Sequence, residues 1–133
     1  MAIVGQFMRT IRILLVDDNF NFLEAAARFL ASDTHIEIVG LVSSGQDALQ
    51  QIEQLQPDLI LMDIALPEVN GLEATRNIKA QPNPPRVIIL TLYDNPEYRS
   101  ASKAAKADGF IAKSELGAQL LPLIHSMFGV QQI

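Results

Sequence analysis

Residues 59–63 read LILMD, four apolar residues in a row that end directly at Asp63. A continuous apolar run of this length is typical of a strand buried on both faces, as parallel strands are when helices cover both sides of a sheet. A second run, IRILLV at residues 11–16, ends in the same way at Asp17 and Asp18. The two stretches predict a parallel sheet whose strands finish at residues able to do chemistry.

The rest of the chain alternates in the same manner. Further strand-like runs are predicted at 36–42, 87–90 and 110–112, and segments with apolar residues at helical spacing separate them. In the first of these segments, residues 20–30, Asn21 followed by Glu24 resembles a helix-capping pair. Five strand–helix alternations joined by right-handed crossovers predict an α/β fold, a doubly wound (βα)5 sandwich.

Composition narrows the class of protein. The 133 residues are 49% hydrophobic and 19% charged, as expected for one globular domain, and the net charge of -5 argues against nucleic acid as the main partner. Because the chain has no cysteine, disulfides and thiolate chemistry are excluded. Neither a secretion signal nor a membrane-spanning run is evident. We therefore expect a cytoplasmic domain over residues 11–129, with an extension at 1–10 and a tail at 130–133.

The residues that follow the strand runs point to a single crevice. Asp17, Asp18 and Asp63 are joined at the predicted strand ends by Thr91 and Lys113. Ligands of open parallel sheets bind outside the carboxyl ends of the strands, where all five side chains would gather. Two carboxylates about 4 Å apart repel by roughly 4 kcal/mol at an effective dielectric of 20, and Mg²⁺, which prefers oxygen ligands, would remove that repulsion. An aspartate beside a metal, a lysine and a hydroxyl is equipped to attack phosphorus.

These motifs closely resemble the response-regulator receiver domains of two-component signalling systems. The resemblance rests on LLVDDN, LILMDIALPEVNGLEA, ILTLYD and DGFIAKSEL, and it covers about residues 11–128. VSSGQDAL, NGLEATRNI and the Lys-Ser-Glu-Leu sequence are most similar to the NarL/LuxR-type branch. The resemblance implies strand order 2-1-3-4-5. It also implies a phosphoacceptor domain, not an enzyme acting on a separate substrate.

The family resemblance assigns a role to each site residue. Asp63 would take the phosphoryl group from a sensor histidine kinase, a phosphotransfer protein or a small phosphodonor. Asp17, Asp18, Asp63 and the backbone carbonyl of Ala65 would hold Mg²⁺.

The resemblance also assigns the residues that respond to phosphorylation. Thr91 would be the switch hydroxyl, Lys113 the lysine that contacts the phosphoryl group, and Phe110 the switch aromatic. A homodimer could form through the face made by the fourth helix, fifth strand and fifth helix.

Two positions depart from the family pattern. Lys106 stands where a glycine commonly precedes Ala-Asp-Gly, so the turn before the fifth strand could differ. Leu92 is larger than the residue often found after the switch hydroxyl. We expect Leu92 at the mouth of the crevice, where it would limit access to Asp63; the alternative is that Leu92 packs beneath the fourth helix.

Three other classes of protein compete with this interpretation. A dehalogenase-like phosphatase requires Asp-x-Asp, whereas Asp63-Ile64-Ala65 lacks the second acid. A flavodoxin-like or nucleotide-binding module would need a glycine- or Ser/Thr-rich phosphate loop after the first strand, where DDNFNF stands. A degenerate receiver that acts as a phosphorylation-independent interaction module remains the alternative. His35 and His125 are interpreted as surface or loop residues.

Overall fold

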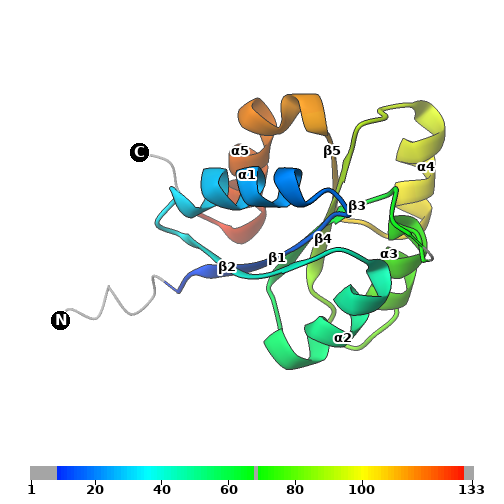
Figure 1. The fold of residues 1–133 in the computed structure, drawn as a ribbon, viewed down its shortest axis with the longest axis horizontal. Helices are drawn as coiled ribbons and strands as arrows, with labels where there is room; N and C mark the ends of the chain where they lie inside the picture. Colours follow the sequence, from blue (N-terminus) through cyan, green and yellow to red (C-terminus); the bar gives the residue numbers. More distant parts are fainter. Residues whose placement is uncertain (1–8, 68, 131–133) are drawn as a thin grey trace.

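The computed structural model describes residues 9–67 and 69–130, which form a five-stranded parallel sheet of order β2-β1-β3-β4-β5 (Figure 1). The strands are β1 (Ile11–Val16), β2 (Ile36–Val42), β3 (Leu59–Asp63), β4 (Arg86–Thr91) and β5 (Gly109–Ala112). The predicted fold and strand order are confirmed.

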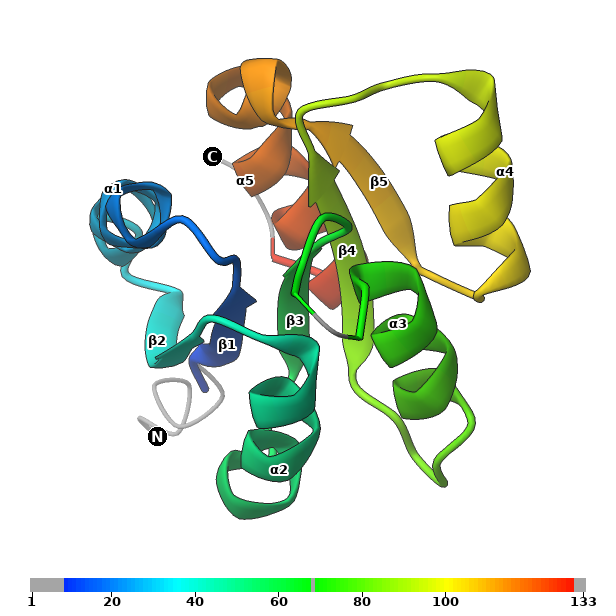
Figure 2. The same ribbon diagram turned by 45° about the vertical axis from the view of Figure 1, so that its right-hand side comes forward.

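Helices cover both faces of the sheet (Figures 1 and 2). They are α1 (Phe20–Ala31), α2 (Gly45–Leu55), α3 (Gly71–Lys79), α4 (Pro96–Ala104) and α5 (Leu116–Phe128), the last preceded by a short 3₁₀ turn, η2 (Lys113–Glu115). Helices α1 and α5 pack on one face, and α2 and α3 pack on the other together with part of α4. No helix within the described ranges is both long and apolar enough to cross a bilayer.

The central strand β3 shows why its sequence is apolar without alternation. Leu59 and Leu61 belong to the core beneath α1 and α5, whereas Ile60 and Met62 belong to the core beneath α2 and α3. Successive side chains of a strand point to opposite faces, and here both faces are covered, so every position before Asp63 must be apolar.

Side-chain caps fix where four of the helices begin. The Asn19 side chain accepts a hydrogen bond from the Phe22 backbone N–H at 3.0 Å, so the predicted cap at Asn21 is wrong. Because Asn19 directly follows the aspartate pair, α1 starts as soon as the chain leaves the sheet. Equivalent caps start the three following helices, at Ser44, Asn70 and Asn95. Each satisfies a backbone donor that the first helical turn leaves free.

The turn from α4 into β5 contains Lys106. This residue has a φ of 69°, in the left-handed region that glycine favours. Its N–H donates to the Lys103 carbonyl at 2.9 Å, and the Ala107 N–H donates to the Ser102 carbonyl at 3.0 Å. This pair of bonds is the Schellman motif, which usually places glycine at this position. Lysine therefore makes the same tight turn, at a cost of about 1–2 kcal/mol.

Candidate functional site

The site lies where β1, β3, β4 and β5 end. The pairing register aligns Val16 with Met62, Asp63 with Leu90, and Thr91 with Ala112, so these strands end at almost the same level. Because the strands are parallel, the residues that follow them meet at one edge, hereafter the carboxyl edge.

Three carboxylates converge at this edge. Asp17, Asp18 and Asp63 each place an oxygen within 4.8 Å of the others. Asp17 and Asp63 are buried, with 2% and 6% of their surface exposed, whereas Asp18 is exposed. Three negative groups at such separations repel strongly, the more so where two are shielded from water.

The Lys113 ammonium lies among these carboxylates. Its Nζ is 2.6 Å from Asp17 Oδ2 and 3.6 Å from Asp63 Oδ2. The same Nζ lies 4.2 Å from the centre of the Phe22 ring, a cation–π contact. This contact has no signal in the sequence, because Phe22 has the spacing of an ordinary core residue of α1. One lysine therefore offsets part of the negative charge and is held by an aromatic neighbour.

Backbone amides orient the two buried carboxylates. Asp17 Oδ1 accepts from the Asn19 N–H at 2.9 Å, and Asp63 Oδ1 faces the Ala65 N–H at 3.4 Å. Burial, followed by the nearby Asp17 carboxylate, raises the pKa of Asp63 from 3.8 to about 6, and Lys113 and the Ala65 amide offset only part of that rise. Asp63 is thus ionised at neutral pH, but its negative charge is destabilised by burial and by repulsion from Asp17.

Gly71 determines how closely α3 approaches the acceptor. A Cβ at this position would lie 1.8 Å from the Asp63 carbonyl oxygen and 3.0 Å from the Ile64 Cα. The Gly71 N–H donates to the Ile64 carbonyl at 2.9 Å. The turn after Asp63 is therefore held against the start of α3. The Asn70-Gly71 dipeptide by itself indicates only a turn, so the sequence carries no sign of this contact.

The remaining predicted residues lie at the end of β4, directly after it, and on β5. Thr91 is 1% exposed, and its hydroxyl oxygen accepts from the Tyr93 N–H at 3.1 Å. Phe110 is half-buried on β5, with the Arg99 guanidinium 4.7 Å from its ring centre. Leu92 is 70% exposed, so the alternative in which it packs beneath α4 is wrong.

The donor set suits a hard divalent cation. All three clustered side chains offer carboxylate oxygens, which Mg²⁺ prefers. Burial and the Asp17 carboxylate raise the pKa of Asp63, so its ionised form is destabilised, and a bound cation would relieve that destabilisation. Asp17, Asp18 and Asp63 therefore fit the predicted ion. It would neutralise negative charge on a transferred phosphoryl group when bound.

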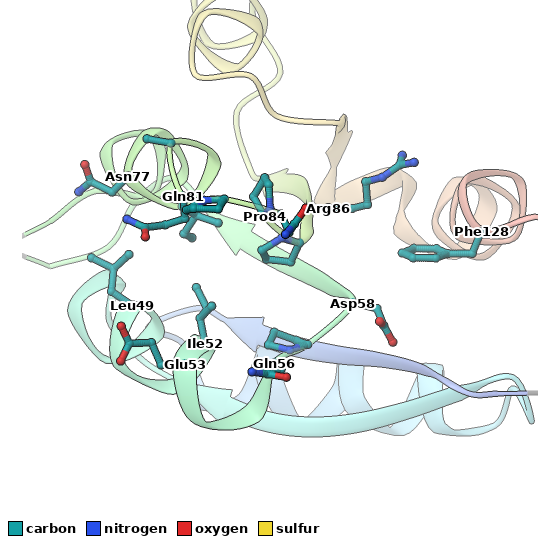
Figure 3. A pocket seen from close by; sticks show the side chains of 16 residues that line it. Leu49, Ile52, Glu53, Gln56, Asp58, Asn77, Gln81, Pro84, Arg86 and Phe128 are labelled. Atoms are coloured by element: carbon teal, nitrogen blue, oxygen red, sulfur yellow. The ribbon is translucent and has the colours of Figure 1, made fainter.

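A separate hollow of about 960 Å³ opens between α2 and the loop from α3 to β4 (Figure 3). Its lining includes Ile52, Gln56, Pro84 and Arg86 but none of the carboxyl-edge residues. It adjoins the start of β4, at the opposite edge of the sheet, and so it is not part of the acidic site.

Comparison with protein families shows which family has this fold and site. The model of the response regulator receiver domain matches residues 13–125. The chain belongs to the response regulator receiver family. As a receiver, it is a domain of two-component signalling systems.

Individual relatives agree with that assignment. The receiver is 35% identical over 111 residues to the transcriptional regulatory protein DegU of Brevibacillus brevis, an overlap of 84% of this chain and 47% of DegU. It is 30% identical over 125 residues to the response regulator VraR of Staphylococcus saprophyticus, covering 92% of this chain and 59% of VraR. The chain thus spans about half the length of these relatives.

A solved structure extends the likeness to the backbone. The crystal structure of a LuxR-family two-component response regulator from Aurantimonas sp. SI85-9A1 superposes with a TM-score of 0.85 at 28% identity, covering 92% of this chain and 88% of that one. The predicted similarity to NarL/LuxR-type receivers is confirmed.

Proposed function

We propose that Asp63 accepts a phosphoryl group and that the receiver then changes conformation to regulate a partner or an output domain. The observation that carries this proposal is the buried Asp63 carboxylate, with Asp17, Asp18 and Lys113 around it at the carboxyl edge. Together these residues offer a nucleophile, three carboxylates that suit a divalent cation, and an ammonium group in one crevice.

The transfer follows from this arrangement. An ionised Asp63 oxygen attacks phosphorus of a phosphohistidine or a small acyl phosphate, a P–O bond forms, and the bond from phosphorus to the donor breaks. The departing imidazole or carboxylate takes the electron pair of the broken bond. Lys113, now 3.6 Å from Asp63 Oδ2, exchanges contact with the carboxylates for contact with a phosphoryl oxygen. Asp17, Asp18, Asp63 and the Ala65 carbonyl would hold Mg²⁺, which would neutralise part of the charge on the phosphoryl oxygens.

The conformational change begins at Thr91. The aspartyl-phosphate adds about -1.5 to -2 charges with strong acceptor oxygens, so a hydroxyl that turns toward it gains a charge-assisted hydrogen bond. That movement breaks the contact from the Tyr93 N–H to Thr91 Oγ1 and vacates space for Phe110. Phe110 then leaves its contact with Arg99, which alters the face made by α4, β5 and α5. Phosphorylation shifts this equilibrium only by its difference in affinity for the two states.

The proposed partners are a phosphoryl donor, a second copy of the chain and an output domain. A sensor histidine kinase or a phosphotransfer protein supplies the group in the cytoplasm, and a second copy of the chain pairs through the α4–β5–α5 face. DegU and VraR are named as regulators and extend beyond the matched length, which supports an output domain as the regulated element.

The test is labelling by acetyl phosphate with Mg²⁺, followed by intact mass spectrometry. We expect one acid-stable, base-labile phosphoryl group on the protein and none on Asp63→Asn. Glu53→Gln is the matched control, because it removes an exposed carboxylate from α2 beside the separate hollow, and it should label normally. Unaltered labelling of Asp63→Asn overturns the assignment. Absence of labelling by both acetyl phosphate and a kinase would favour the phosphorylation-independent interaction module.

A further inference from the structure

A second group of potential metal ligands lies away from the acidic site. Asp33 and His35 belong to the turn between α1 and β2, and His125 belongs to the last part of α5. Their ligand atoms lie within 4.8 Å of one another. The chain contains only two histidines, and although 90 positions separate them in the sequence, both meet the same carboxylate.

The carboxylate of Asp33 is the centre of this cluster. His125 Nε2 is 2.6 Å from Asp33 Oδ2, and His35 Nδ1 is 3.1 Å from Asp33 Oδ1. The two rings meet edge to face with centres 5.8 Å apart. The His35 backbone N–H also donates to Asp33 Oδ1 at 2.8 Å, which fixes the orientation of the carboxylate. His125 is 9% exposed, so the interpretation of both histidines as surface or loop residues is wrong for His125.

We propose that Asp33, His35 and His125 form a binding site for a divalent transition-metal ion of the zinc class. Two imidazole nitrogens and one carboxylate oxygen are ligands that suit Zn²⁺, and they leave a fourth tetrahedral position for water. Ligand atoms around tetrahedral zinc lie roughly 3.4 Å apart, given bonds of about 2.0–2.1 Å. The two imidazole nitrogens lie 2.6 and 3.1 Å from different oxygens of Asp33, and the ligand atoms of the three residues all lie within 4.8 Å of one another. An ion would replace the two hydrogen bonds and hold the nitrogens slightly farther from the carboxylate.

This site differs from the acidic site in ligand chemistry and in position. Mg²⁺ prefers the three carboxylates of the carboxyl edge, whereas nitrogen ligands favour zinc, cobalt or nickel. His35 immediately precedes β2, and its carbonyl accepts from the N–H of Ile11, the first residue of β1. The cluster therefore lies at the opposite edge of the sheet, the amino edge. An ion bound there joins the α1–β2 turn to α5.

The experiment is a titration of the purified, tag-free protein with ZnCl₂ by calorimetry, with Mg²⁺ in large excess to occupy the acidic site. We expect one zinc ion per chain and a Tm that rises by several degrees, because an ion that binds only the folded state stabilises it. His35→Asn and His125→Asn should each weaken zinc binding by about tenfold or more, since loss of even an indirect supporting partner costs about 10–100-fold. Glu37→Gln, which removes an exposed carboxylate two residues beyond His35, should bind zinc as the unaltered protein does.

A second measurement keeps the proposal testable if a variant folds poorly. In the unaltered protein, substoichiometric Co²⁺ should broaden the imidazole proton signals of both histidines, which are the only two in the chain. Sharp, unshifted histidine signals at saturating Co²⁺ would overturn the proposal. So would equal zinc affinity in the unaltered protein and a folded His35→Asn variant, which would leave the cluster as a hydrogen-bonded ion pair alone.

Discussion

The two edges of the sheet place aspartates in opposite electrostatic situations. At the carboxyl edge, burial and the Asp17 carboxylate raise the pKa of Asp63 to about 6. At the amino edge, burial would also raise the pKa of Asp33, but hydrogen bonds from the His35 backbone and from the rings of His125 and His35 hold it below its ordinary value. The ionised form of an aspartate is thus destabilised at the carboxyl edge and stabilised at the amino edge.

The difference separates a cluster whose negative charges stay unbalanced without an ion from one whose carboxylate already has hydrogen-bond donors before any ion binds. Three carboxylates face one ammonium at the carboxyl edge, so charge remains for an external cation and a phosphoryl group to use. At the amino edge one carboxylate faces two imidazoles. Perturbed groups of the first kind cluster at functional sites because their energetic cost is part of the function.

The largest expected effect tests the backbone that supports the carboxyl edge. Gly71→Ala forces a methyl group against the Asp63 carbonyl, so α3 or the acceptor must move, and we expect a loss of at least about 3 kcal/mol in unfolding free energy together with loss of labelling. Urea unfolding and acetyl phosphate labelling measure both. Gly117→Ala is the matched control, because nothing lies within 4 Å of a Cβ there, and it should stabilise α5 by about 0.5–1 kcal/mol. Equal behaviour of the two variants would show that α3 does not constrain Asp63.

Asp63→Asn should raise stability at the carboxyl edge. A carboxyl group whose pKa is raised in the folded state contributes stability that is fully present below pH 3.8 and is lost as the pH rises through about 6. The neutral amide avoids that loss, so without metal the variant should gain up to roughly 3 kcal/mol at pH 8, from about 1.4 kcal/mol per pH unit. The gain should shrink as the pH is lowered toward 4. Urea unfolding in chelator at several pH values tests this, and a gain independent of pH would contradict the explanation.

The same substitution at the amino edge should have the opposite sign. The pKa of Asp33 is lowered because its hydrogen bonds to His35 and His125 outweigh burial, so its ionised form contributes stability that is present above pH 3.8 and is lost as the pH falls through the lowered folded value. Asp33→Asn should cost about 1–3 kcal/mol at pH 7, the range for hydrogen bonds to charged groups. Paired unfolding curves of Asp33→Asn and Asp63→Asn measure the contrast directly. Stabilisation by both would remove the distinction between the two edges.

The smallest effect on stability concerns Leu92, next to Thr91 at the carboxyl edge. Its side chain is 70% exposed, so Leu92→Ala should change unfolding free energy by no more than about 0.5 kcal/mol. If Leu92 narrows the path to Asp63, labelling by acetyl phosphate and hydrolysis of the aspartyl-phosphate should both become faster. Leu41→Ala removes another exposed apolar side chain, on the edge strand β2, and should leave both rates unchanged. Unchanged rates in Leu92→Ala would show that this residue does not limit access.

Much of the carboxyl edge could be predicted because its signals are local. Apolar runs such as 59–62 are strands covered on both faces, and their length and lack of alternation are properties of a few consecutive residues. Parallel strands bring their carboxyl ends to one edge, so the order of chemical groups along the chain was enough to place Asp17, Asp63 and Lys113 together. The cap at Asn19 was missed because several polar residues in a row could start a helix and only the backbone geometry selects one.

The sequence by itself thus determined the alternation of strands and helices and the residues standing at the strand ends. Only the tertiary structure decided contacts between segments whose spacing carries no signal. Gly71 resembled a turn glycine until α3 was seen against the Asp63 carbonyl, and His35 and His125 resembled isolated histidines until α5 packed beside α1. The physical reason is that strand and helix periodicity are written in neighbouring residues, whereas the approach of one element to another depends on how the whole core is filled.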